Sequence, residues 1–136
     1  MNRIPPIKVL FAYHSADRGG VDEYLYTVIK HLNRERVAPS VLVPRPSAIN
    51  ERYATMNIPV LDLGLRSNGF RAQDILRLGR VIKQYDVIHG NSICRSTRNV
   101  GFASRLTGKP FIWHVYEVLT AAHGSLARVL RIADQV

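Results

Sequence analysis

The chain has 136 residues, 46% of them hydrophobic and 21% charged. This length and apolar content suit one compact domain, and they exclude a disordered or collagen-like chain and a membrane-spanning helix. Nineteen basic residues against ten acidic ones give a net charge of +9, which favours anionic partners such as nucleotide phosphates, acidic lipids or nucleic acid.

Strand-like and helix-like segments alternate along the first half of the chain. The strand-like segments are short and rich in β-branched and aromatic residues. Of the helix-like segments, the first repeats apolar side chains every three or four residues, from Tyr24 to Leu32. The predicted order is a strand at 7–13, a helix at 20–33, a strand at 41–43, a helix at 47–56 and a strand at 58–63.

The alternation continues in the second half. The pattern predicts a helix at 71–84, a strand at 86–89, a helix at 98–107, a strand at 111–115 and a helix at 119–133. In the first of these helices Ile75, Leu78 and Ile82 form an inner stripe, and Arg77, Arg80 and Lys83 lie opposite. The last three residues, 134–136, read as the start of a sixth strand, so we expect a fragment or an isolated half of a larger protein.

Repeated strand–helix units predict an α/β fold, a doubly wound, mainly parallel, Rossmann-like sheet of order 3-2-1-4-5 with helices on both faces. We expect residues 1–136 to form one such domain, truncated at the start of the sixth strand. The short apolar stretch near the amino end cannot form a signal-peptide core. The single cysteine, Cys94, excludes an internal disulfide framework and a thiolate-rich zinc site, and indicates a cytoplasmic setting.

Polar residues cluster where the predicted strands end, which is where open α/β sheets bind ligands. These candidate substrate-binding residues are His14, Gly19, Gly20, Asn91, Ser92 and Glu117, with His114 as the candidate catalytic residue. Gly19-Gly20 directly precedes a helix, so its backbone could approach a phosphate closely, although the pair is also an ordinary turn. The dinucleotide and Walker-loop glycine patterns are both absent.

Each candidate also has a purely structural explanation. His114 could act as a general base, because imidazole is the side chain most often used for proton transfer, or it could be an ordinary strand-end histidine. Glu117 could bind hydroxyl groups or cap the next helix. His89 follows apolar strand residues and is expected to be packed with its hydrogen bonds satisfied. No histidine–carboxylate spacing indicates a metal, so we expect no metal and no bound cofactor.

Four segments, in this order, resemble the amino-terminal half of the two-domain (GT-B type) retaining glycosyltransferases of family four. The first is Val9-Leu10-Phe11 followed by Asp17-Arg18-Gly19-Gly20-Val21-Asp22-Glu23, similar to the family's strand, glycine pair and acidic helix start. The other three are Tyr85-Asp86-Val87-Ile88-His89, Gly108-Lys109-Pro110 with Ile112-Trp113-His114-Val115-Tyr116-Glu117, and Arg131-Ile132-Ala133-Asp134-Gln135-Val136. The resemblance spans nearly the whole chain.

The resemblance implies the acceptor-side half of a retaining, hexosyltransferase-like enzyme that moves a sugar from a nucleotide-sugar to a glycan or lipid-linked acceptor. Gly19-Gly20 would meet the donor diphosphate, and His114 would lie near the reacting centre. The family's donor-side pair of glutamates, eight residues apart, is missing from this chain. A carboxyl-terminal donor-binding domain is therefore expected as a partner, and this half alone is expected to be inactive.

Two other functions remain open from the sequence. One is a stand-alone nucleotide- or anion-binding module without catalysis. The other is nonspecific nucleic-acid binding, which charge alone suggests and the lack of interleaved aromatic residues argues against. The basic helix face with Arg77, Arg80 and Lys83 would also suit a peripheral contact with acidic lipid on the inner membrane face, although a solvated helix face explains it as well.

Overall fold

The computed structural model describes residues 4–12, 19–43, 48–64, 72–92, 95–116 and 131–135. Strands and helices alternate throughout these ranges, as the sequence predicts. In chain order the elements are β1 (Ile7–Ala12), α1 (Gly20–Lys30), β2 (Val37–Val43), α2 (Ala48–Ala54), β3 (Val60–Asp62), α3 (Ala72–Ile82), β4 (Val87–Asn91), α4 (Arg95–Thr107) and β5 (Phe111–His114).

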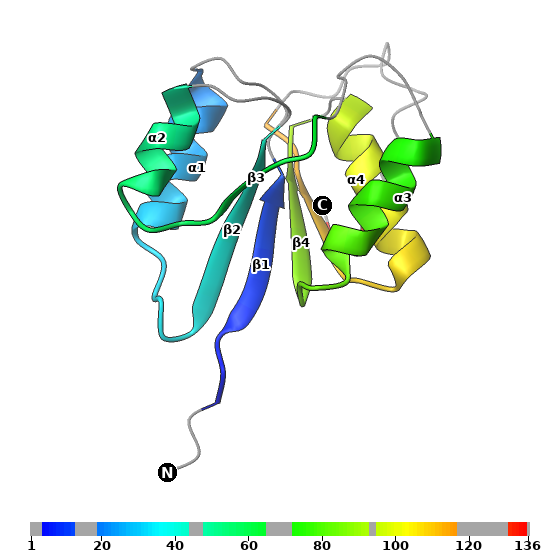
Figure 1. Cartoon of the computed structure of the whole chain (residues 1–136), viewed down its shortest axis with the longest axis horizontal. Coiled ribbons are helices and arrows are strands. Elements are labelled where there is room, and N and C mark those ends of the chain that lie inside the picture. The colour runs from blue at the N-terminus through cyan, green and yellow to red at the C-terminus, as the bar shows by residue number, and fades with distance from the viewer. Residues whose placement is uncertain are drawn as a thin grey trace.

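The five strands form one parallel sheet in the order β3-β2-β1-β4-β5, which confirms the predicted fold and strand order. Helices α1 and α2 cover one face of this sheet, and α3 and α4 cover the other (Figure 1). The chain reverses its direction of travel across the sheet between β1 and β4. In open α/β sheets this switch point is where ligands bind, beyond the carboxyl ends of the strands.

Two apolar cores, one on each face, hold the layers together. The predicted stripe of α3 is confirmed, because Ile75, Leu78 and Ile82 are buried against the sheet. The core beneath α3 and α4 also contains Leu10, Ala12, Leu42, Ile88, Val100, Ala103, Phe111 and Trp113. The core beneath α1 and α2 contains Phe11, Leu25, Ile29, Val41, Val43, Tyr53 and Ile58.

Strand β2 begins four residues earlier than the sequence predicted, at Val37. The four residues that the prediction left out include Pro39, which has no N–H to give to a neighbouring strand. In this sheet the backbone N–H of Val41 points toward β3 and donates to the carbonyl of Pro59, 2.9 Å away. Pro39, two residues earlier, faces the same side, but β3 pairs only with residues 41–43. The proline therefore interrupts no hydrogen bond.

Beyond β5, the polypeptide pairs once more with the sheet. Gln135 forms an isolated parallel bridge with Ile112, and its carbonyl accepts the N–H of Trp113 at 2.8 Å. This agrees with the expectation that residues 134–136 begin a sixth strand. The predicted helix at 119–133 falls mostly outside the described residues. None of the helices within the described ranges has the length and apolar character that a bilayer crossing requires.

Gly90 lies where α4 packs most closely on the sheet. A methyl group added there would lie 2.6 Å from the Thr97 Cγ2 atom and 2.8 Å from two ring carbons of Phe111, all far inside contact distance. We therefore expect Gly90→Ala to lower the free energy of unfolding by about 1–3 kcal/mol, through overpacking. Chemical denaturation followed by circular dichroism measures this change.

Gly79, in the middle of α3, offers a matched control. A methyl group there would make only an ordinary contact, 3.5 Å from the Thr107 Cγ2 atom. Because alanine favours a helix over glycine, Gly79→Ala should raise the stability by up to about 1 kcal/mol. Equal effects of the two substitutions would contradict the close packing at Gly90.

Candidate functional site

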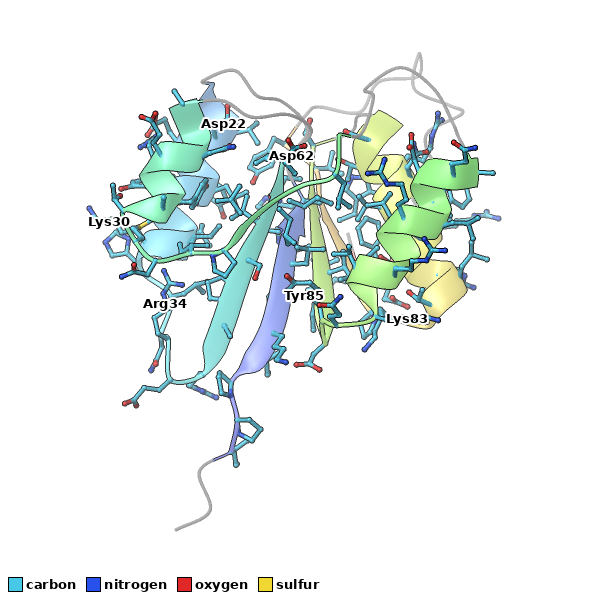
Figure 2. All side chains as sticks on the ribbon, in the orientation of Figure 1. Asp22, Lys30, Arg34, Asp62, Lys83 and Tyr85 are labelled. Atoms are coloured by element: carbon cyan, nitrogen blue, oxygen red, sulfur yellow. The ribbon has the colours of Figure 1, made fainter. Side chains whose placement is uncertain are left out.

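Helix α1 begins at the carboxyl edge of the sheet without a side-chain cap. Gly19 is extended (φ −152°, ψ 178°), and its carbonyl accepts the N–H groups of Asp22 and Glu23, each at 3.1 Å. The first N–H groups of a helix have no acceptor within it, and those of Gly20 and Val21 have no recorded acceptor among the described residues, so they could serve a ligand. Figure 2 labels two residues at this edge, Asp22 in α1 and Asp62 at the end of β3. The positive end of the α1 dipole thus faces this edge.

Neither glycine is needed for the fold of the described residues. Neither has the left-handed backbone conformation that favours glycine. A Cβ atom on Gly20 would meet nothing within 4 Å, and one on Gly19 would meet only a carboxylate oxygen of Asp22, at 3.8 Å. As far as the described residues show, the space beside the helix start is open, and a glycine there allows close approach by another molecule.

Asn91 ties three parts of this edge together. Its amide nitrogen donates to the carbonyl of Ala12 at the end of β1 (3.2 Å), and its amide oxygen accepts from the Tyr116 hydroxyl (3.1 Å). We predicted Asn91 in a loop after β4; instead β4 runs to Asn91, which pairs with His114 of β5. Its side chain is wholly buried, so it braces the edge from below.

Ser92 is also held by β5 rather than by its own loop. Its N–H donates to the His114 carbonyl at 2.9 Å, and its carbonyl accepts from the indole N–H of Trp113 at 2.8 Å. These bonds hold Ser92 at a φ of 65°, in the left-handed region that non-glycine residues seldom occupy. Residues strained in this way persist only where the surrounding structure holds them in place, and they cluster at functional sites.

His114 lies in an aromatic cluster at the same edge. Its ring stacks on that of Tyr116, with centroids 4.2 Å apart and planes 10° apart. The ring of Tyr24 meets both edge-on, at 5.3 Å from His114 and 5.4 Å from Tyr116. Tyr24 follows Gly20 by four residues and so shares its face of α1. The structure thus brings the helix start, Asn91 and His114 to one place, and within the described ranges no carboxylate contacts the His114 ring.

The sequence analysis did not identify the two tyrosines. It assigned Tyr24 to the apolar face of its helix, but the side chain is 47% exposed because this end of α1 reaches the edge of the sheet. Two signals were available. Tyr24 lies one helical turn after Gly20, and Tyr116 lies two residues after His114, which places both on one face of an extended segment. Tyr24 and Tyr116 therefore belong with His114 in any account of the site.

His89 lies beneath this cluster, half-buried in β4. Its ring is 5.1 Å from that of Phe11 and 5.9 Å from that of His114. Packing was predicted correctly, but satisfied hydrogen bonding was not: the buried Nδ1 atom has no partner among the residues that the structure describes. Burial, and secondarily the neighbouring His114, lower the pKa of His89 from 6.5 to about 4. His89 is therefore neutral at physiological pH.

Two predicted site residues, His14 and Glu117, lie outside the described residues, as does Cys94. The ranges that are described contain no group of three histidine, cysteine, aspartate or glutamate side chains able to hold a metal ion. The edge thus combines a helix start, an aromatic cluster with one exposed tyrosine, and a histidine.

Neither the protein-family models nor the curated proteins contain a match to this sequence. Solved structures do match. MurG from Acinetobacter baumannii has a TM-score of 0.69 at 21% identity, over 96% of this chain and 40% of its own. HepE from Anabaena, in complex with UDP and glucose, has a TM-score of 0.70 at 20% identity, over 93% of this chain and 35% of its own. What they share with this chain is the fold.

A third match carries an activity in its name. It is a UDP-N-acetylglucosamine 2-epimerase, described as putative, from Listeria monocytogenes, with a TM-score of 0.62 at 16% identity. This chain covers 37% of that protein's length. It therefore spans 40% or less of each of the three proteins. Likeness of fold does not fix a reaction, so the reaction must be argued from the site.

Proposed function

We propose that this chain is the acceptor-side half of a glycosyltransferase that moves a sugar from a nucleotide-sugar donor to a glycan or lipid-linked acceptor. One observation carries the proposal: at the switch point of the sheet, Tyr24, one helical turn after Gly20, links the start of α1 to the ring of His114. The structural likeness to HepE, whose structure holds UDP and glucose, supports a nucleotide-sugar as the donor.

The chemistry of the edge suits a departing nucleoside diphosphate. Free N–H groups and the positive dipole end stabilise phosphate charge at a helix start, and more so as that charge develops during transfer. The missing Cβ atoms at Gly19 and Gly20 let phosphate oxygens reach the backbone. His114 is the candidate for the base or for a contact at the reacting centre, held in orientation by Tyr116 and, through it, by Asn91.

The finer features of the proposal follow from the family resemblance. Transfer would retain the anomeric configuration, would need no metal and would use a hexose. A carboxyl-terminal domain would supply the donor-sugar and ribose contacts that this chain lacks, so residues 1–136 alone would be inactive. The setting would be cytoplasmic. Arg77 and Arg80, exposed on α3, would support a peripheral contact with acidic lipid.

The test is sugar transfer by this chain translated together with roughly 150 residues of downstream coding sequence, a typical domain length. Nucleotide-sugars are supplied as a panel, and products are detected by mass spectrometry. We expect transfer by the longer protein and none by residues 1–136. His114→Gln should lower kcat about 100-fold, as expected for the loss of a proton-transfer group. No transfer or hydrolysis across the panel would contradict the enzymatic proposal.

Gly20→Val tests the phosphate contact separately. A Cβ atom at this position would meet nothing within 4 Å among the described residues, so stability should be nearly unchanged while KM for the donor rises about tenfold or more. Gly79→Ala, more than a turn beyond the start of α3 and on the other face of the sheet, is the control and should leave KM unchanged. A Gly20→Val protein with an unaltered KM would exclude the helix start from the donor site.

A binding module without catalysis is the competing proposal, favoured by the same open helix start. It requires saturable binding of UDP to residues 1–136 themselves at moderate salt. It also requires that the longer protein transfers no sugar. Sugar transfer by the longer protein therefore separates the two proposals.

A further inference from the structure

A hollow lies at the edge of the sheet opposite the candidate functional site, at the amino ends of β1 and β2. It has a volume of about 580 Å³, within the range of small-molecule sites. It exists because β3 is only three residues long and pairs with Val41–Val43, which leaves the lower half of β2 without a strand on its outer side. Figure 2 shows Arg34 and Tyr85 on either side of this lower half of the sheet. We call it the amino-edge pocket.

The polar lining of the amino-edge pocket is positively charged and largely unpaired. Lys8 and Arg34 contribute to it, and no carboxylate does. Among the described residues neither cation has an ion-pair partner; Arg34 donates one 3.3 Å hydrogen bond to the Ile29 carbonyl. The nearby carboxylate of Asp86 accepts the backbone N–H of Lys8 at 2.8 Å and so is engaged with the backbone. Two cations thus face the hollow with donors to spare.

The remaining lining combines uncharged polar groups with an apolar floor. Tyr85 and Gln84 come from the turn after α3, and the side chain of neither is hydrogen-bonded within the described part of the chain. Met56 and Pro59, from the segment before β3, supply apolar surface. A few polar groups that converge on an apolar surface are typical of sites for small molecules rather than of a solvated face.

The backbone of this edge argues against a peptide as the occupant. An added strand needs donors and acceptors along the open edge. On the outer side of lower β2, the Val37 N–H already donates to the Asn33 carbonyl at 2.9 Å, and Pro39 has no N–H. Only carbonyl groups remain, so donors for a ligand must come from side chains, and those of Lys8 and Arg34 are the charged ones. Those donors suit an anion.

We propose that the amino-edge pocket binds a small organic anion, with its phosphate or carboxylate oxygens at Lys8 and Arg34 and its apolar body on Met56 and Pro59. The pocket is separate from the candidate functional site. Strands rise about 3.3 Å per residue, so the six residues of β1 put roughly 20 Å between the two edges. Occupation of this pocket would therefore not compete with a nucleotide at the carboxyl edge.

The experiment is a two-dimensional ¹H–¹⁵N NMR titration of the chain with phenyl phosphate and benzoate, and with benzyl alcohol as the uncharged probe. We expect saturable shifts at the amides of Ser40, Asn57 and Gln84, and binding of benzyl alcohol that is at least about fivefold weaker. The stronger of the two anions identifies the charged group. Shifts at Gly20 and Val21 would instead report binding at the carboxyl edge. Equal binding of the uncharged probe, or no saturable shift, would overturn the proposal.

Charge variants test the two cations. Lys8→Gln and Arg34→Gln should each weaken binding about fivefold, the effect of an exposed ion pair near 1 kcal/mol. Lys83→Gln and Arg77→Gln remove exposed charges of the same kind outside the pocket and should have no effect. Equal effects of all four would show a general response to net charge and would overturn the site.

A third variant covers the case in which the loss of Arg34 unfolds the protein. Gln84→Glu keeps the side-chain shape and adds one negative charge to the lining. It should reduce anion affinity at least about fivefold while leaving benzyl alcohol unaffected. Unchanged anion affinity in a folded Gln84→Glu protein would overturn the proposal, because the charge would then not lie near the ligand.

Discussion

Replacement of Trp113 by alanine is expected to lower the free energy of unfolding by about 3–5 kcal/mol. The Trp113 side chain is wholly buried in the core under α3 and α4, and its ring centroid lies 5.6 Å from that of Phe111. Its indole N–H also donates to the Ser92 carbonyl. The substitution removes both, and such a loss is a large part of the 5–15 kcal/mol that stabilises a typical domain. Urea denaturation followed by far-ultraviolet circular dichroism measures it.

Two variants separate packing from hydrogen bonding in this effect. Trp113→Phe keeps a ring in the core but leaves the Ser92 carbonyl without its donor, so we expect a smaller loss of about 1–3 kcal/mol. Leu106→Ala removes a side chain that is 76% exposed and should change stability by no more than about 0.5 kcal/mol. If Trp113→Ala behaved like Leu106→Ala, the ring could not lie in the core.

Stability should fall by about 3 kcal/mol between pH 6.5 and pH 4 because of His89. Its pKa is lowered from 6.5 to about 4 in the folded protein, first by burial and then by the charge of His114. Below pH 6.5 His89 binds a proton in the unfolded chain, whereas in the folded protein it binds one only near pH 4. The contribution is thus complete above pH 6.5 and lost as the pH falls to 4, at 1.36 kcal/mol per pH unit.

His89→Phe removes the titrating group while keeping a flat ring beside Phe11. The difference in unfolding free energy between this variant and the parent should grow by about 3 kcal/mol from pH 7 to pH 4. A parallel pH dependence of parent and His89→Phe would mean that His89 is accessible to solvent and protons in the folded state.

The fold could be predicted because hydrophobic periodicity and topology agree in this chain. Alternating strands and amphipathic helices allow few arrangements other than a parallel, doubly wound sheet. The predicted bounds of two strands, β2 and β4, were less accurate. The prediction began β2 at Val41, whereas the strand starts at Val37 and includes Pro39, which lies where β3 does not pair with β2. Gly90 and Asn91 appeared to form a loop, whereas they continue β4 under α4.

The site was only partly predictable, because several of its contacts depend on distances between segments. The sequence indicated the helix start at Gly19-Gly20 and the strand-end residues Asn91 and His114. It could not indicate that Asn91 bonds to both Ala12 and Tyr116, which are 79 and 25 residues away. Nor could it indicate that Nδ1 of His89 lacks a partner among the described residues, since burial of that atom depends on how β1, β4 and β5 meet.

The central position of β1 affects the order in which the molecule can assemble. Ile7 pairs with Val37, thirty residues later, so β1, β2 and β3 with their two helices can form early, together with the core beneath α1 and α2. The other edge of β1 must wait for Val87, which pairs with Val9. During synthesis at about 5–20 residues per second, that edge stays unsatisfied for several seconds. Over this interval the nascent chain presents a half-built sheet that other strands, or a chaperone, could contact.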